Sequence, residues 1–197
     1  MKPLPKILLI LTAVAAVSVA YPAKANLIVN PGFETGSNTT APPWQFGGGQ
    51  IQNSPAGTVN GVAPHSGNRQ WAIYGGQIPG TLSQSVATTP AATYTIAFFA
   101  ATTFVQGPVS LTVTFGGTTV FNHLFTSDTG YTQYTANVTV PGSLSTLNFS
   151  VGGIGYLLLD DVSVEPAGVG VPDGGTTVSL LGCALLGLAA LRRKLGC

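Results

Sequence analysis

Cysteine and positive charge are both scarce in this chain of 197 residues. The two cysteines, Cys183 and Cys197, stand near the C-terminus, so no disulfide framework supports residues 26–170. That region carries one basic residue, Arg69, against five carboxylates, which leaves a net charge of −4. A surface with so little positive charge cannot neutralise phosphates, and the composition therefore argues against nucleic-acid binding.

Motifs of common hydrolases are also missing. The sequence has no Gly-x-Ser-x-Gly nucleophile elbow and no His-Glu-x-x-His zinc motif. Its two histidines, His65 and His123, stand next to turn-like sequence, and an ordinary loop position explains His65 better than a role as metal ligand. We therefore expect no enzymatic activity. A glycoside hydrolase, which needs two carboxylates a few ångströms apart, is the least favoured function.

The N-terminus has the composition of a secretory signal peptide. Lys2 and Lys6 precede a hydrophobic stretch from Ile7 to Val19, and the small-x-small sequence Ala23-Lys24-Ala25 follows it. This order predicts that residues 1–25 are cleaved off during export. The alternative is an uncleaved membrane anchor, against which the cleavage sequence argues.

The C-terminus combines a short motif, a hydrophobic run and a basic end. Val171-Pro172-Asp173-Gly174-Gly175 leads into an apolar run from Val178 to Leu191, and Arg192-Arg193-Lys194 follows. As a helix this run is about 21 Å long, whereas a hydrocarbon core is about 30 Å thick, so a buried helix is the alternative by length. The run is apolar all round and its basic end fits the positive-inside rule, which predicts a membrane helix at about 176–191 within a segment 171–197.

This tail resembles the PEP-CTERM class of bacterial sorting signals, in the variant that carries a Val-Pro-Asp-Ser-Gly motif. Gly174 stands where that variant has serine. The resemblance covers roughly residues 171–195 and implies recognition by an exosortase-type membrane protease. It also implies cleavage near the motif, release to the cell surface or extracellular matrix, and at least transient anchorage in the membrane.

Residues 26–170 carry strand periodicity and no sustained helical period. Gly116-Gly117 predicts a hairpin into residues 118–125, and Gly152-Gly153 is predicted to end one strand before a last strand at 156–165. Turn signals about every 8–12 residues predict an all-β antiparallel β-sandwich, a jelly roll of roughly eight to ten strands. Apolar and polar residues alternate in Tyr94–Phe98, Leu111–Phe115, Tyr134–Val140 and Leu147–Val151.

Five short motifs follow one another through residues 26–165. They are Asn26–Glu34, His65-Ser66-Gly67, Leu82–Val86, Thr93–Phe98 and Leu159–Val164. In this order they resemble carbohydrate-binding modules and related extracellular domains of the galactose-binding-like fold. The resemblance covers nearly all of this region and implies the same fold. In modules of that fold, the residues that match Glu34 and Asp160 bind a structural Ca²⁺.

Two adjacent aspartates in the last strand have different predicted positions. Asp160 alternates with Leu158 and Val162, which predicts that its side chain faces the core, whereas Asp161 should point outward into solvent. An unpaired inward carboxylate is costly, so Asp160 needs hydrogen bonds, a cation or both.

Glu34 and Asp160 are the candidate metal ligands. The resemblance implies that they hold calcium, and carbonyls around Gly32 and Gly67 would have to help because calcium takes six to eight oxygens. Two alternatives involve no metal. The carboxylates accept hydrogen bonds from backbone N–H groups of loops, or Arg69 pairs with one of them.

Trp44 and Tyr74 are the candidate ligand-binding residues. Sugar rings stack on flat exposed aromatic faces with polar groups around them, and Trp44 beside Gln45 and Tyr74 beside Gln77 suit that role. The alternative is core packing, because large aromatic side chains usually supply buried area in a β-sandwich.

These features together predict an exported bacterial protein of the cell envelope or extracellular matrix. The favoured function is carbohydrate binding in a surface layer, biofilm or exopolysaccharide, with polysaccharide and an exosortase-type processing protease as partners. The alternative is a structural matrix or surface protein with no small-molecule ligand. An aromatic platform would favour the first hypothesis, and uniformly buried aromatics would favour the second.

Overall fold

A computed structural model describes residues 25–37, 39–49 and 53–167. They belong to one compact unit of the chain, Lys24–Gly170. The predicted signal peptide and the predicted membrane helix lie outside the described residues, apart from Ala25, and stay predictions. The sorting motif also lies outside the described residues. Within the described residues, no helix is long and apolar enough to cross a membrane.

Eight strands and no helix make up the described part of the chain. All strand pairs are antiparallel, which confirms the predicted all-β class. The strands are β1 (Gln45–Gly47), β2 (Asn53–Ala56), β3 (Gln70–Ala87), β4 (Thr93–Thr103), β5 (Val109–Phe115), β6 (Thr118–Phe125), β7 (Thr129–Thr139) and β8 (Leu144–Pro166).

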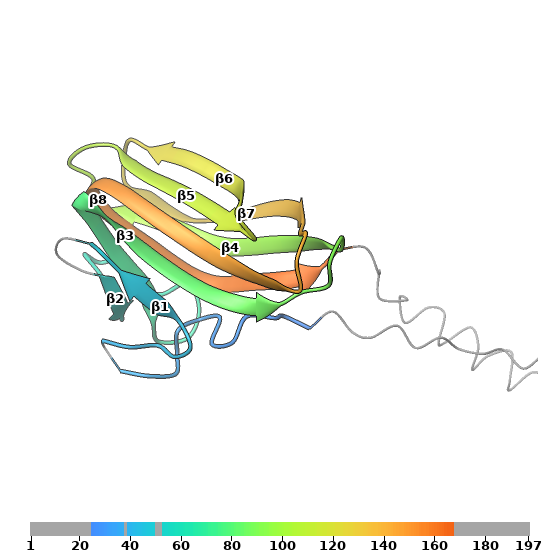
Figure 1. The fold of residues 1–197 in the computed structure, drawn as a ribbon. Helices are drawn as coiled ribbons and strands as arrows, with labels where there is room; N and C mark the ends of the chain where they lie inside the picture. Colours follow the sequence, from blue (N-terminus) through green and yellow to red (C-terminus); the bar gives the residue numbers. More distant parts are fainter. Residues whose placement is uncertain (1–24, 38, 50–52, 168–197) are drawn as a thin grey trace, which may run out of the picture. The chain divides into compact units, whose positions relative to one another are not determined.

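The two long strands, β3 and β8, run side by side and take part in two layers (Figure 1). Residues 76–87 of β3 and 144–153 of β8 form the centre of a first layer, in the order β6–β5–β8–β3–β1. Residues 71–74 of β3 and 156–166 of β8 form the centre of a second layer, in the order β7–β4–β8–β3–β2. Long strands that bend from one layer into the other are a known way of making the corners of a sandwich.

One core fills the space between the layers, and alternate residues of each strand supply it. Because residues 26–170 contain no cysteine, the buried apolar area has to stabilise the domain, at about 1.5–3 kcal/mol for each large side chain. The fully buried core residues include Leu82, Leu111, Val113, Phe115, Leu147 and Phe149 from the first layer and Trp71, Ile73, Ile96, Leu157 and Leu159 from the second.

The predicted glycine hairpin is present between β5 and β6. Phe115 pairs with Thr118, so Gly116 and Gly117 alone form the turn. Their φ angles are 56° and 84°, a conformation that glycine adopts without steric cost and that suits the twist of a two-residue hairpin.

The predicted strand end at Gly152-Gly153 is wrong, because β8 continues through these glycines. Gly76 of β3 pairs with Gly153, whose φ is 96°, and the register of the two strands is irregular there. A Cβ atom on Gly153 would overlap the carbonyl oxygen of Pro108. The glycines therefore bend β8 from the first layer into the second instead of ending it.

Residues 57–69, between β2 and β3, cover the outer surface of the second layer. Val59 and Val62 hydrogen-bond to each other through their backbones at 3.0 and 2.9 Å. Val59 also joins a second, smaller apolar cluster on this surface, and Val62 packs against it. The buried members of that cluster are Val59, Ala72, Ala101 and Leu158.

The side chain of Gln70 holds this loop in place from the start of β3. It is fully buried, and its Nε2 donates to the carbonyl oxygens of Gly57 at 2.6 Å and Val62 at 2.9 Å. Its Oε1 accepts a hydrogen bond from the hydroxyl of Tyr131 in β7. The loop is therefore fixed to β3, and Gln70 connects it to Tyr131 of β7.

Candidate functional site

Asp160 is fully buried, as predicted, but on the outer surface of the second layer and not in the core between the layers. Its strand neighbour Leu158 belongs to the outer cluster, whereas Val162 belongs to the main core. Asp160 lies opposite Phe99 of β4, and the backbone N–H of Ser66 in the covering loop donates to its Oδ2 at 3.1 Å.

A β-bulge at Asp161 explains why strict alternation fails here. Ala97 pairs with Ser163 and Phe99 pairs with Asp160, so Phe98 alone faces two residues of β8. Asp161 has a φ of 48°, in the left-handed region that aspartate tolerates better than most residues. The bulge shifts the alternation by one residue, which directs Val162 inward and brings both aspartates to the covering loop.

Asp161 faces outward as predicted, and its side chain is 32% exposed, but side chains of the loop also bind its carboxylate. Its Oδ2 lies 2.6 Å from Nδ1 of His65, and its Oδ1 accepts a hydrogen bond from Oγ of Ser66 at 2.6 Å. The imidazole of His65 also stacks on Phe99, with ring centroids 3.6 Å apart. Asp161 therefore fixes the loop at His65 and Ser66.

Glu34 binds the same loop from the N-terminal segment. Its Oε1 accepts hydrogen bonds from the backbone N–H groups of Asn68 and Arg69, both at 2.8 Å. This is the predicted alternative in which carboxylates accept loop N–H groups. In the described parts of the chain, the ion pair is between His65 and Asp161, and Arg69 pairs with neither predicted ligand. We call Glu34, Asp160 and Asp161 the carboxylate clamp.

Electrostatics within the clamp disfavour a charged Asp160. The pKa of Asp160 is raised to about 6: burial is the largest cause and the negative charge of Asp161 adds to it, while backbone N–H groups of Ser66, Asp161 and His65 oppose the rise. Burial also raises the pKa of Tyr131, and the charges of Asp160 and Asp161 add to that effect. A nearby cation would relieve this cost.

The donor chemistry of the clamp fits calcium. Its side chains supply only oxygen, the ligand that calcium prefers. Both predicted glycines lie against the carboxylates: a Cβ on Gly32 would be 3.4 Å from Oδ1 of Asp160, and a Cβ on Gly67 would overlap Glu34. Within the described residues, no three His, Cys, Asp or Glu side chains form a metal-binding group, so backbone carbonyls would have to complete the coordination.

His65, Ser66 and Asp161 include the residue types of a catalytic triad, but their hydrogen bonds differ from one. In a triad, serine binds histidine and histidine binds the acid. Here Ser66 and His65 both bind Asp161, so the serine has no hydrogen-bonded base. Asp160 is buried, and it therefore forms no open pair of carboxylates with Glu34.

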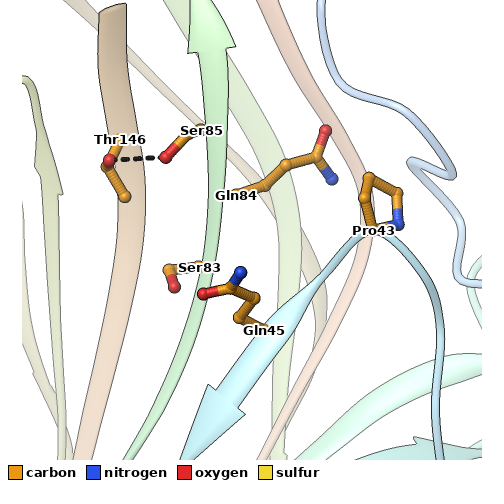
Figure 2. Close-up of a pocket in the computed structure, with 6 residues that line it drawn as sticks. All are labelled: Pro43, Gln45, Ser83, Gln84, Ser85 and Thr146. Carbon is orange, nitrogen blue, oxygen red and sulfur yellow. Dashed lines mark hydrogen bonds between the residues drawn. The ribbon is translucent and has the colours of Figure 1, made fainter.

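A pocket of about 340 Å³ opens on the outer surface of the first layer, at the edge formed by β1 and β3 (Figure 2). Figure 2 shows that Gln84 and Ser85 point to opposite sides of β3, and that Gln45 of β1 lies beside Ser83. Ser85 hydrogen-bonds to Thr146 of β8 at 2.8 Å. The lining residues are Pro43, Gln45, Ser83, Gln84, Ser85 and Thr146.

Gln84 forms part of the pocket wall, but its side-chain amide is already hydrogen-bonded to the backbone of Val29. It is buried, its Oε1 accepts the N–H of Val29 at 2.8 Å, and its Nε2 donates to the carbonyl oxygen of Val29 at 2.9 Å. No sequence motif marks this pocket. The alternation of Leu82, Gln84 and Val86 with Ser83 and Ser85 was the available signal, since it places the serines on the outer surface.

Uncharged polar side chains continue from the pocket across the whole first layer. We call this surface the polar face. Two cross-strand rows form it: Gln45, Ser83, Asn148, Thr114 and Thr119 in one, and Thr81, Ser150, Thr112 and Asn122 in the other. Neither row contains a charged residue. The carboxylates Asp160, Asp161 and Glu165 are in the part of β8 that belongs to the second layer.

The two aromatic residues predicted to bind ligand are buried. Trp44 is 5% exposed, its ring packs 5.3 Å from that of Phe33, and its Nε1 donates to the carbonyl oxygen of Asn30 at 2.9 Å. Tyr74 is 7% exposed and meets the ring of Tyr156 edge-on at 5.0 Å. Neither ring offers a free face for a sugar, so their placement agrees with the alternative of core packing.

Comparison with known sequences identifies the C-terminal tail. The profile of the VPDSG-CTERM motif matches residues 170–195. No curated protein sequence matches the chain significantly.

Solved structures share the fold of the domain. TmCBM61, determined in complex with β-1,4-galactotriose, superimposes with a TM-score of 0.53 at 22% identity over 72% of this chain and 99% of its own. The CBM22-1 xylan-binding domain of Xyn10C from Paenibacillus barcinonensis gives 0.54 at 17% identity, over 77% and 100%. The K3 adhesin domain of Lys-gingipain from Porphyromonas gingivalis gives 0.53 at 16% identity, over 73% and 99%. The domain therefore has the β-sandwich fold of carbohydrate-binding modules.

Proposed function

We propose that this protein is exported to the cell surface or extracellular matrix and binds a neutral polysaccharide there. The observation that carries the proposal is the pocket at the edge of the uncharged polar face. The fold, which sugar-binding and adhesin domains share, supports the same function. The VPDSG-CTERM motif supports export and processing by an exosortase-type protease.

The chemistry of the polar face suits neutral sugars. Hydroxyl and amide groups donate and accept hydrogen bonds, as sugar hydroxyls do, and the net charge of −4 over residues 26–170 repels acidic glycans. Each neutral hydrogen bond contributes about 0.5–1.5 kcal/mol. Since no aromatic platform adds to them on this face, we expect a weak site with a Kd of about 1 mM for a single chain segment.

Glycan binding by the domain of residues 26–170 tests this function. A glycan array should select neutral oligosaccharides, and calorimetry should show that Gln45→Ala weakens binding by about two- to tenfold, the cost of one hydrogen bond. Gln106→Ala removes an exposed amide between β4 and β5, outside the pocket lining, and should leave affinity unchanged. Binding of acidic glycans alone, or equal loss in both variants, would contradict the assignment.

The second candidate is a structural matrix protein with no small-molecule ligand. The burial of Trp44 and Tyr74 favours it, because the sequence offered these rings as the sugar platform. Under this hypothesis the polar face contacts other macromolecules weakly over a broad area. An array without any bound glycan would select this function.

We also propose calcium as a structural ion at the carboxylate clamp. Glu34 and Asp160 would hold it, with carbonyl oxygens near Gly32 and Gly67. The ion would supply positive charge beside the buried carboxylate of Asp160, and the clamp would then fix the covering loop more firmly.

A further inference from the structure

Strand β7 forms an edge of the second layer and has an open side. Among the described residues, it hydrogen-bonds as a strand only to β4. From Thr132 to Thr139 its register with β4 is uninterrupted. The strand contains no lysine, arginine, aspartate, glutamate or proline. Alternate N–H and C=O groups of this stretch therefore face away from β4 along a straight, uncharged edge.

The other edge strands described here are protected against pairing. β1 has three residues, and β2 has four and contains Pro55. β6 is interrupted by an irregular register next to Thr114 of β5. Short length, proline and bulges are the usual devices that prevent one sheet edge from pairing with another, and β7 lacks all of them from Thr132 onward.

Packing holds β7 ready for a partner. The ring of Tyr134 points to the core side. Its centroid lies 4.8 Å from the ring centroid of Phe121 and 5.7 Å from that of Phe98. On the outer side, Asn137 accepts a hydrogen bond from Thr95 at 2.8 Å, and Thr139 bonds to Thr93 at 2.8 Å. An edge fixed on both faces loses little conformational entropy when another strand pairs with it.

We propose that β7 is a self-association edge at which a second copy of this chain pairs antiparallel with it. Such a pair has twofold symmetry, so a residue at the axis meets itself. With Thr135 at the axis, Gln133 of each copy faces Asn137 of the other, and Thr135 faces Thr135. These pairs are uncharged and form hydrogen bonds, so the strand is complementary to itself.

Charge also favours a second copy, and the buried area predicts how strongly it binds. Asp160, Asp161 and Glu165 are in β8, and the uncharged strand β4 separates them from the β7 edge. Asp128 precedes β7, and with Thr135 at the axis it faces Gly142 of the other copy, so two copies approach without close repulsion. With Thr135 at the axis, residues 132–138 of each copy form seven regular pairs, which bury less area than a standard interface and predict weak association in solution. Many copies tethered to one surface would raise the effective concentration and strengthen it.

Sedimentation of the domain of residues 26–170 tests the proposal without any glycan. The average mass of the wild type should rise with concentration toward that of a dimer. Thr135→Lys places two like charges opposite each other and should leave a monomer at the same concentrations. A mixture of Thr135→Lys and Thr135→Glu should form the dimer again, because opposite charges then meet at the axis.

The controls separate edge pairing from folding and from total charge. Thr126→Lys adds the same charge at an exposed residue between β6 and β7 and should associate as the wild type does. Circular dichroism should show the same strand content in all variants, and Gln133→Lys provides a second edge variant if Thr135→Lys does not fold. A wild type that is monomeric at all concentrations, or Lys variants that associate as well as the wild type, would overturn the proposal.

Discussion

At the scale of single residues, the position of one aspartate decides how the candidate ion site is built. A regular strand would direct Asp160 and Asp161 to opposite surfaces. The bulge and the left-handed conformation of Asp161 bring both carboxylates to the loop of residues 57–69. Three carboxylates then bind one loop, and burial makes the charged form of Asp160 expensive.

Calcium removal is the prediction that belongs to this scale. EDTA should lower the melting temperature of the domain of residues 26–170 by about 5–10 °C, because the folded state loses an ion that the unfolded chain does not bind. Asp160→Asn keeps the size of the side chain and should abolish this sensitivity. Asp128→Asn changes an exposed carboxylate outside the clamp and should leave the shift intact. Identical melting curves with and without EDTA would remove calcium from the account.

At the scale of strands, glycine determines where the sheet bends. β3 and β8 together carry the pairings of both layers, and the register irregularities between them lie at Gly76, Gly80 and Gly153. Gly153 combines a positive φ with close backbone contact, whereas Gly61 has a positive φ of 83° and open space around its missing side chain. A side chain at Gly61 would therefore cost only the free energy of the left-handed backbone conformation. A side chain at Gly153 would also cost the free energy of the overlap with the backbone.

Alanine substitution at these two glycines should therefore have unequal effects. Gly61→Ala should lower the free energy of unfolding by about 1 kcal/mol, the cost of the left-handed conformation alone. Gly153→Ala should lower it by roughly 3 kcal/mol or more, because its Cβ also meets the backbone of Pro108. Urea denaturation measures both values. Equal losses would mean that the bend accommodates a side chain.

At the scale of the whole molecule, three features suit three proposed roles. The polar face suits sugar binding, the β7 edge suits pairing with a second copy, and the C-terminal tail suits sorting to the cell surface. The polar face belongs to the first layer and the β7 edge to the second, so the proposed glycan site and the proposed pairing edge are on different surfaces. A protein that binds a polysaccharide and also pairs with itself would cross-link that polysaccharide.

Deletion of residues 171–197 tests whether the C-terminal tail directs the protein to the cell envelope. We expect the truncated protein to appear in the medium of its host instead of the envelope fraction, because the VPDSG-CTERM motif is lost. Immunoblots of the medium and of cell fractions measure the distribution. A variant without residues 1–25 provides the control and should stay inside the cell. Unchanged retention after deletion of the tail would mean that another part of the chain holds the protein at the surface.

The sequence by itself determined the class of the fold, because local physics controls it. Period-two alternation marked the core faces of β4, β5 and β7, and two glycines fixed the β5–β6 hairpin. The sorting motif of the tail could also be recognised from the sequence, because such a motif is a short linear signal. Asp160 could be named in advance because it alternates with Leu158 and Val162, and Glu34 was named from the resemblance to modules of the galactose-binding-like fold.

Only the tertiary structure decided how these residues meet. Whether Trp44 faces solvent depends on Phe33, eleven positions earlier, and on Phe149, which is distant in sequence. The pocket joins side chains of β1, β3 and β8, and no local pattern specifies that register. The bulge at Asp161 and the bend at Gly153 likewise follow from long-range pairing, because one extra residue changes the direction of every side chain beyond it.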